Sequence, residues 1–240
     1  MKILGVKIDQ ITYQEALERA KAMIDAGGSH YVVTPNPEII VRANREPQLR
    51  KILNNADLSV PDGMGLVMLG RLTGRPIPER VTGVDLLDGL AALATEGGFD
   101  IFLLGAGEGV AERAASKLKL KYPGLRVTGT YSGDPDPKFD KQTRRILESK
   151  KIDILAVAYG APKQEKWIAR NLPYLNLKLA IGVGGALDYI SGERKRAPTW
   201  LQKAGLEWLF RLLKEPRRVS RQLALPYFVY LVLKERSVKR

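Results

Sequence analysis

Short, continuously apolar runs recur along this chain, and each is followed or preceded by a stretch with the spacing of an amphipathic helix. The clearest runs are FDIFLLG (99–105), IDILAVAY (152–159) and LKLAIGV (177–183). A strand with one solvent-exposed face alternates apolar and polar residues, whereas these runs are apolar at nearly every position. Both faces of such strands are therefore expected to be covered by helices, as they are in parallel sheets. The pattern predicts an α/β fold.

The other expected elements complete an alternation of strands and helices. The further strands are 2–8, 30–34, 57–60 and 125–131, and the helices are 12–26, 37–55 with a break near Pro47, 63–72, 84–96, 108–121, 137–150 and 162–171. This order is typical of a Rossmann-like, mostly parallel sheet with flanking helices. A length of 240 residues suffices for one large domain, or for one domain with an appendage.

The positive charge is concentrated at the C-terminal end. The formal net charge is +13, and residues 194–240 hold 13 Lys/Arg and 3 Asp/Glu, a net of +10. The rest of the chain is nearly neutral. Such asymmetry indicates a polyanionic partner: nucleic acid, an anionic membrane or a phosphorylated ligand. Cysteine is absent, which excludes disulfides and thiolate chemistry, and a single histidine makes a zinc site difficult to assemble.

Two apolar segments lie within this basic region. Residues 199–213 predict an amphipathic helix with two tryptophans, and LALPYFVYLVL (223–233) is too short to span a bilayer. The second segment is either a terminal helix packed on the body or an interfacial element whose flanking cations meet lipid phosphates. The flanking charges favour the interfacial alternative. We therefore expect an α/β domain over 1–195 and a helical, membrane-binding appendage over 196–240.

Five loops rich in glycine or proline follow predicted strands, at 34–37, 61–65, 105–109, 159–164 and 182–186. Ligands of open α/β sheets bind at the carboxyl ends of the strands, so these loops predict a shared pocket. The GAGEG loop (105–109) suits a diphosphate, because its glycines let the backbone approach and a helix N-terminus follows. A tight turn that binds nothing is the alternative. NAD is disfavoured, because the nearest acid, Asp134, lies beyond the next strand.

Acidic residues at three places in the sequence have more than one interpretation. Asp62, in VPDGMGL (60–66), is a turn residue, the N-cap of helix 63–72, or a base that deprotonates a hydroxyl nucleophile. Capping and catalysis are not exclusive, and we expect Asp62 to cap or begin this helix and also to serve as the base. Asp134-Pro-Asp136 imitates a metal-binding D-x-D, but the prolines around it favour a turn. Asp188 either caps a helix or accepts a hydrogen bond from a base or a sugar hydroxyl.

Six motifs occur together and in a fixed order. They are TPNPE (34–38), VPDGMGL (60–66), RVTGVDL (80–86), FLLGAGEGVAE (102–112), YGAPKQEKW (159–167) and GVGGALDYISGERKRAP (182–198). Over nearly all of residues 1–200 the chain resembles the WecG/TagA/CpsF glycosyltransferase family, and its tail is similar to that of the TagA members.

The resemblance implies an enzyme that moves a sugar from a UDP donor to undecaprenyl-diphosphate-linked GlcNAc at the cytoplasmic face of the membrane. For TagA-like members the donor is UDP-N-acetylmannosamine, the 4-hydroxyl attacks with inversion, and the product enters wall teichoic acid synthesis. No metal or other cofactor is expected. Another UDP-sugar, such as UDP-ManNAcA or UDP-glucose, stays an alternative donor.

The resemblance also implies site residues. Asp62 is the expected base, Thr34, Asn36 and Gln164 are expected to line the sugar and phosphate site, and Asp188 is expected to read the uracil or ribose. The expected substrate- and UDP-binding residues are Gly105, Ala106, Gly107, Tyr131, Gly160, Lys163, Gly184 and Asp188.

The departing UDP needs cations, and without a metal these must come from the protein. Arg211, Arg218 and Arg221 of the tail are the expected phosphate ligands, because the guanidinium fork binds phosphate in a bidentate way. We expect the tail to fold over the pocket when it meets the membrane. An oxidoreductase and a nucleic-acid-binding module are the rival functions. A homo-oligomer that buries the apolar surface is also compatible with the sequence.

Overall fold

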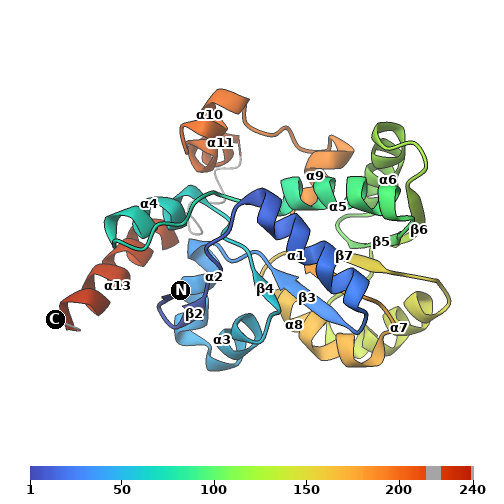
Figure 1. Cartoon of the computed structure of the whole chain (residues 1–240), viewed down its shortest axis with the longest axis horizontal. Helices are drawn as coiled ribbons and strands as arrows, with labels where there is room; N and C mark the ends of the chain where they lie inside the picture. Colours follow the sequence, from blue (N-terminus) through green and yellow to red (C-terminus); the bar gives the residue numbers. More distant parts are fainter. Residues whose placement is uncertain (215–222, 239–240) are drawn as a thin grey trace.

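The computed structural model describes residues 1–214 and 223–238, which build a six-stranded parallel sheet between two layers of helices (Figure 1). The strand order is β4-β3-β8-β7-β5-β6, and every neighbouring pair is parallel. The strands are β3 (His30–Val33), β4 (Leu58–Ser59), β5 (Asp100–Gly105), β6 (Arg126–Tyr131), β7 (Ile154–Ala158) and β8 (Leu179–Gly182). The α/β prediction is confirmed.

Helices cover both faces of this sheet. One layer holds α1 (Tyr13–Ala26), α5 (Gly83–Gly97), α6 (Val110–Lys121) and α9 (Ala186–Ser191); the other holds α2 (Pro37–Arg45), α3 (Pro47–Asn54), α7 (Asp140–Glu148) and α8 (Lys163–Asn171). Two 3₁₀ turns, η1 (Pro137–Phe139) and η2 (Leu172–Tyr174), join α7 and α8 to their neighbours.

The apolar runs are divided between the two layers residue by residue. Along β5, Ile101 and Leu103 pack under α1, α5 and α6, whereas Phe102 and Leu104 pack against α8. Successive side chains of a strand point to opposite faces, so a strand buried on both faces needs apolar residues at every position. This explains why the sequence runs are continuous rather than alternating.

The expected strand over residues 2–8 is wrong. These residues form a separate antiparallel hairpin of β1 (Lys2–Ile3) and β2 (Val6–Lys7). Leu4 and Gly5 occupy its turn with φ of 49° and 78°, a pair of positive values that suits a tight hairpin and that Gly5 adopts without strain. By contrast, the break near Pro47 is confirmed, since α2 ends at Arg45 and α3 begins at Pro47.

The C-terminal region folds differently from the single helix expected over 199–213. Gly205, at φ 74°, separates α10 (Thr199–Lys203) from α11 (Glu207–Lys214). These short helices lie above α4 (Met64–Leu72), and α13 (Ala224–Val238) lies beside α4 (Figure 1). In the described ranges, no helix combines the length and the apolar composition that crossing a bilayer requires.

One face of α13 is part of the core. Phe228 and Val232 are buried among residues of α2, α3 and α4, and the guanidinium of Arg45 lies over the ring of Tyr227 at 5.1 Å. The opposite face exposes Tyr230 and Leu233. The apolar run therefore serves as a packed terminal helix, and it also presents apolar side chains to solvent.

The histidine at the start of β3 generates a pH-dependent contribution to stability. His30 Nδ1 lies 3.0 Å from Asp57 Oδ1, and its Nε2 lies 3.1 Å from the carbonyl oxygen of Gly27. Both partners are acceptors, so only the doubly protonated ring satisfies both. The hydrogen bond with Asp57 raises the pKa of His30.

Because the folded pKa is higher than the unfolded value of about 6.5, this stabilisation is complete below that pH and is lost as pH rises through the folded pKa. We predict that His30→Gln lowers Tm more at pH ~5.5 than at pH ~8.5. Asp57→Asn should weaken the same pH dependence. An equal Tm loss for His30→Gln at both pH values, measured by calorimetry, would contradict this account.

Candidate active site

A pocket of about 470 Å³ opens at the carboxyl ends of β3, β4, β7 and β8, and the C-terminal region forms part of its wall. Its lining from the sheet side includes Thr34, Asn36, Asp62, Arg80, Thr82, Gly160, Gln164, Gly184 and Tyr189. Its lining from the C-terminal region includes Gly205, Glu207, Trp208, Arg211, Leu225 and Val229. The site is therefore built jointly by the α/β body and the tail.

Backbone hydrogen bonds fasten three motif loops to one another. The amide of Asp62 donates to the carbonyl of Pro35 at 2.9 Å, and the amide of Val81 donates to the carbonyl of Pro61 at 2.9 Å. The TPN, PDG and RVTG segments thus form one connected rim. A shift of one of these loops would disturb the others.

Asp62 does not cap its helix, so that expectation is wrong. The N-cap of α4 is Gly63, at φ 120°, and no side chain makes the capping hydrogen bond. This φ lies in a region that side-chain-bearing residues rarely adopt, and the turn at Gly63 leaves the Asp62 side chain among the pocket residues. The Asp62 carboxylate therefore lines the pocket and does not cap the helix.

The environment of Asp62 disfavours its charge. Burial raises the pKa of its carboxyl group to about 6, against the lowering effect of Arg211 and Arg80, while Glu207 and Asp85 raise it further. Asp62 nevertheless keeps partial exposure toward the pocket. A carboxylate with this pKa is ionised at neutral pH and is more basic than an ordinary aspartate, which suits a general base.

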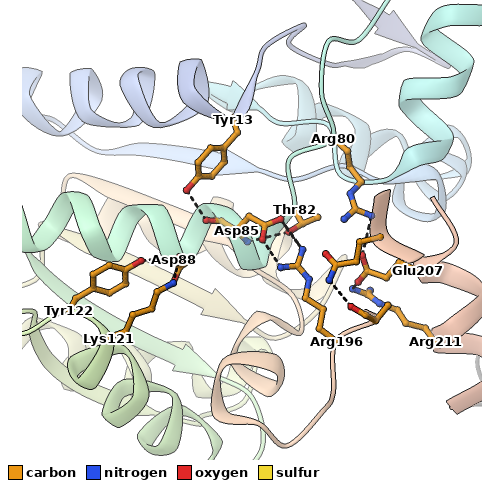
Figure 2. Close-up of polar contacts among 12 residues, drawn as sticks. Tyr13, Arg80, Thr82, Asp85, Asp88, Lys121, Tyr122, Arg196, Glu207 and Arg211 are labelled. Carbon is orange, nitrogen blue, oxygen red and sulfur yellow. Dashed lines mark hydrogen bonds and ion pairs between the residues drawn. The ribbon is translucent and has the colours of Figure 1, made fainter. Parts of the chain in front are cut away.

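A buried chain of charges joins the tail to the body beside Asp62. Figure 2 shows the carboxylate of Glu207 between two guanidinium groups. Glu207 Oε2 lies 3.0 Å from Arg80 Nη1, and Glu207 Oε1 accepts a hydrogen bond from Arg211. The Arg211 guanidinium also lies over the ring of Tyr189, 5.0 Å from its centroid.

A second ion pair fixes the segment that leads into the tail. Arg196 donates hydrogen bonds to both carboxylate oxygens of Asp85, at 2.5 and 2.8 Å (Figure 2). Thr82 is the N-cap of α5, and its hydroxyl group donates a hydrogen bond to Asp85 at 2.7 Å. Burial would raise the pKa of Asp85, but the hydrogen bonds from Arg196 and Thr82 outweigh it and lower that pKa. Asp85 is thus a structural anion.

Gln164 ties together the loops that follow β7 and β8. Its Oε1 accepts from the amides of Gly160 at 3.1 Å and Gly184 at 2.9 Å, and its Nε2 donates to Glu165 at 2.9 Å. Burial raises the pKa of Glu165 to about 7. The two backbone donors fix the orientation of the Gln164 amide at the pocket wall.

Seven of the residues predicted from the sequence line this pocket: Thr34, Asn36, Asp62, Gly160, Gln164, Gly184 and Arg211. Thr34 donates to the carbonyl of Gly182 at 3.1 Å, and Asn36 caps α2 through its Oδ1. The predicted residues Gly105, Ala106, Gly107, Tyr131, Lys163 and Asp188 do not line it. Arg218 and Arg221 lie outside the described residues.

Backbone packing accounts for the first residue of the glycine loop. A Cβ at Gly105, which has φ 101°, would lie 2.8 Å from the backbone of Ala158, and the amide of Ala106 donates to the carbonyl of Ala158 at 3.1 Å. The loop is thus pinned to the end of β7. Asp134 and Asp136 accept from the backbone amides of Asp136 and Lys138, which makes them turn residues.

Sequence reasoning missed Arg80, Glu207, Arg196 and Tyr189. Three of them fall inside recognised motifs, RVTGVDL and GVGGALDYISGERKRAP, which marked their positions without indicating their roles. Glu207 lies in no recognised motif, and only its being one of three acids among the 13 cations of the tail set it apart. Across residues 1–214 and 223–238, carboxylate and imidazole groups do not gather in threes as a metal site would require.

Comparison with known proteins places these features in a family. The family model described as "Glycosyl transferase WecG/TagA/CpsF family" matches residues 1–240. Three similar proteins are each named N-acetylglucosaminyldiphosphoundecaprenol N-acetyl-beta-D-mannosaminyltransferase. The Bacillus spizizenii protein is 35% identical over 88% of this chain and 81% of its own length.

The Bacillus subtilis protein (strain 168) is 34% identical over 92% of this chain and 85% of its own length. The Staphylococcus aureus protein (strain MRSA252) is 32% identical over 99% of this chain and 94% of its own length. These names support the glycosyltransferase interpretation over the oxidoreductase alternative.

The raised pKa of Asp62 predicts a substitution that stabilises the protein. The folded state holds the Asp62 proton to about pH 6, whereas the unfolded chain releases it near pH 3.9, so stability is lost as pH rises between these values. Asp62→Asn should therefore raise Tm at pH 8, and this gain should shrink as pH falls toward 4. Asp25→Asn, on the exposed surface of α1, controls for the loss of one negative charge. A pH-independent effect of Asp62→Asn on Tm would contradict this.

Proposed function

Because the chain belongs to the WecG/TagA/CpsF glycosyltransferase family, we propose that it transfers N-acetylmannosamine from UDP-N-acetylmannosamine to GlcNAc-diphospho-undecaprenol. The reaction would build a disaccharide on the lipid in wall teichoic acid linkage-unit synthesis. The names of the relatives support the acceptor and the transferred sugar. The observation that carries the mechanism is a partly desolvated carboxylate, Asp62, set beside arginines in a pocket at the strand ends.

The proposed reaction is a single displacement. Asp62 takes the proton from the 4-hydroxyl of the acceptor GlcNAc, and the hydroxyl oxygen attacks the anomeric carbon of the donor. The bond from that carbon to the β-phosphate oxygen breaks, so UDP leaves and the configuration inverts. Arg211 stabilises the charge that develops on the departing diphosphate, in a role that other enzymes give to a metal ion. The reaction is therefore proposed to need no metal.

Other pocket residues are proposed to hold the donor. Thr34, Asn36 and Gln164 lie on the rim around Asp62, where hydroxyl and amide groups can bind sugar hydroxyls and phosphate oxygens. The glycine loop, Tyr131, Lys163 and Asp188 lie beyond the pocket lining. A nucleotide that reached them would have to extend from the pocket toward β5 and α9.

The proposed location is the inner face of the cell membrane, with residues 196–240 as the docking appendage. The apolar lining of the pocket continues through Met68, Leu72 and Val229, and Tyr230 and Leu233 are exposed on α13. A lipid-linked acceptor has both a diphosphate and an apolar chain, which suits a pocket with polar and apolar walls. The part of the tail that forms the pocket wall would exclude water from the donor.

The catalytic proposal predicts metal-independent, acceptor-dependent release of UDP. Wild type should release UDP from UDP-N-acetylmannosamine in EDTA when a GlcNAc-diphosphate lipid is present, and Asp62→Asn should lose ~10²–10⁴-fold in kcat. The log of kcat/KM should fall with unit slope below about pH 6, as Asp62 of the free enzyme becomes protonated. Full activity of Asp62→Asn would overturn the role of Asp62. Release from a different UDP-sugar alone would overturn the donor.

The docking proposal predicts a selective loss of membrane binding. Leu233→Glu should weaken co-sedimentation with vesicles that contain anionic lipid, because it places a negative charge on the exposed face of α13. Leu120→Glu on α6 is the matched control, since Leu120 is also an exposed leucine and lies on a distant helix. Equal binding of the two variants would contradict the docking surface. Loss of self-association instead of vesicle binding would assign this face to an oligomer.

A further inference from the structure

We propose that Glu207 is a positioning residue, which seats α11 on the body and holds the Arg211 guanidinium at the pocket beside Asp62. The inference rests on the proposed function for its kinetic consequences, but its structural basis is independent of the substrate. Glu207 does not need to touch substrate in this account. It acts through the two arginines that flank it.

The first argument is the placement of the carboxylate. Glu207 is 5% exposed, and each of its oxygens faces a different guanidinium, Arg80 from the body and Arg211 from the same helix. A buried carboxylate between two cations is strongly held only while both partners stay in place. The arrangement therefore resists separation of α11 from the body.

The second argument is the connection to the base. Arg80 immediately precedes Val81, whose amide donates to the carbonyl of Pro61, the residue before Asp62. Through its ion pair with Arg80 (Figure 2), Glu207 thus links the tail to the rim that carries Asp62. One carboxylate fixes the distance between the loop of the base and the helix of the phosphate-binding arginine.

The third argument is the hydrogen-bonding capacity that Arg211 keeps for a ligand. Its Nη2 donates to Glu207, its guanidinium plane lies on Tyr189, and its Nε is buried with no hydrogen-bond partner among the described residues. An unpaired buried donor on a cation is costly unless a ligand oxygen satisfies it. Glu207 and Tyr189 therefore hold Arg211 in a fixed orientation with donor capacity left for an anion.

The isosteric variant Glu207→Gln tests this directly. A glutamine has one acceptor oxygen, so it can serve one guanidinium, while its NH₂ group would face the donors of the other. We expect amide hydrogen exchange to rise across 207–214 and kcat to fall at least ~10-fold, because Arg211 is no longer held. Asp25→Asn, which also breaks an i,i+4 ion pair but on the exposed surface of α1, is the matched control.

A double-mutant cycle separates positioning from a general loss of structure. In an Arg211→Gln background, Glu207→Gln should lower kcat by less than ~2-fold more, because its effect runs through Arg211. Additive losses in kcat would overturn the proposal, and so would wild-type kcat in Glu207→Gln. If Glu207→Gln fails to fold, Arg80→Gln removes the other end of the link. It should produce the same rise in exchange across 207–214, and unchanged exchange there would overturn the proposal.

The exchange measurement keeps the two proposals distinguishable. If wild type released no UDP with any acceptor, the proposed function would fail. Faster exchange across 207–214 in Glu207→Gln would still support the seating of α11 by Glu207, and unchanged exchange would overturn it. The pH profile of active variants adds a check on Asp62, since Arg211, Arg80, Glu207, Asp85 and Arg196 all act on its charge.

Discussion

The register of the parallel sheet is the constraint from which the site follows. Leu58, Val32, Ile181, Ala156 and Leu103 pair in one row across five strands, and all of them are buried in the same core. A slip of one residue would turn such a row to the other face of the sheet, so the packing on both faces fixes the register. With the register fixed, the loops after β3, β4, β7 and β8 must meet at one edge. The pocket is where they meet.

At that edge, the pKa values of the carboxylates depend on a balance between burial and the neighbouring charges. Asp62, Asp85 and Glu207 lie near Arg80, Arg196 and Arg211, so the local formal charge is close to neutral. Desolvation nevertheless dominates at Asp62 and makes it more basic than an ordinary aspartate. Asp85 has the same chemical group, but direct hydrogen bonds from Arg196 and Thr82 keep its pKa low. Two aspartates of one rim thus differ in basicity: Asp62, the proposed base, has a raised pKa, and Asp85, a structural anion, has a lowered one.

Much of this could be read from the sequence, because short-range patterns determine it. Continuous apolar runs predicted the buried parallel strands, and glycine and proline after them predicted the rim. Single residues with special backbone geometry were harder to place. Gly5 turned an expected strand into a hairpin, Gly205 divided an expected helix, and Gly63 took the N-cap that Asp62 was expected to fill.

The charge network could not be read from the sequence, because its members are distant along the chain. Arg80 and Glu207 are separated by more than half of the chain, and nothing local indicates that they pair. The predicted tail arginines were chosen for their charge and for the guanidinium fork that binds phosphate, without knowledge of where they lie. The structure adds a reason for Arg211, since it lies on Tyr189 and bonds to Glu207 at the pocket. The glycine loop had the opposite outcome, because a chemically suitable motif lies outside the pocket lining.

The central claim is that the body and the tail together form one site, with Asp62 facing the acceptor and Arg211 holding the departing diphosphate. The most direct measurement is a crystal structure of the full chain with UDP bound. The account predicts the diphosphate inside the pocket, within hydrogen-bonding distance of the Arg211 guanidinium. A diphosphate seated on the Gly105–Gly107 loop, away from Arg211 and Asp62, would contradict it.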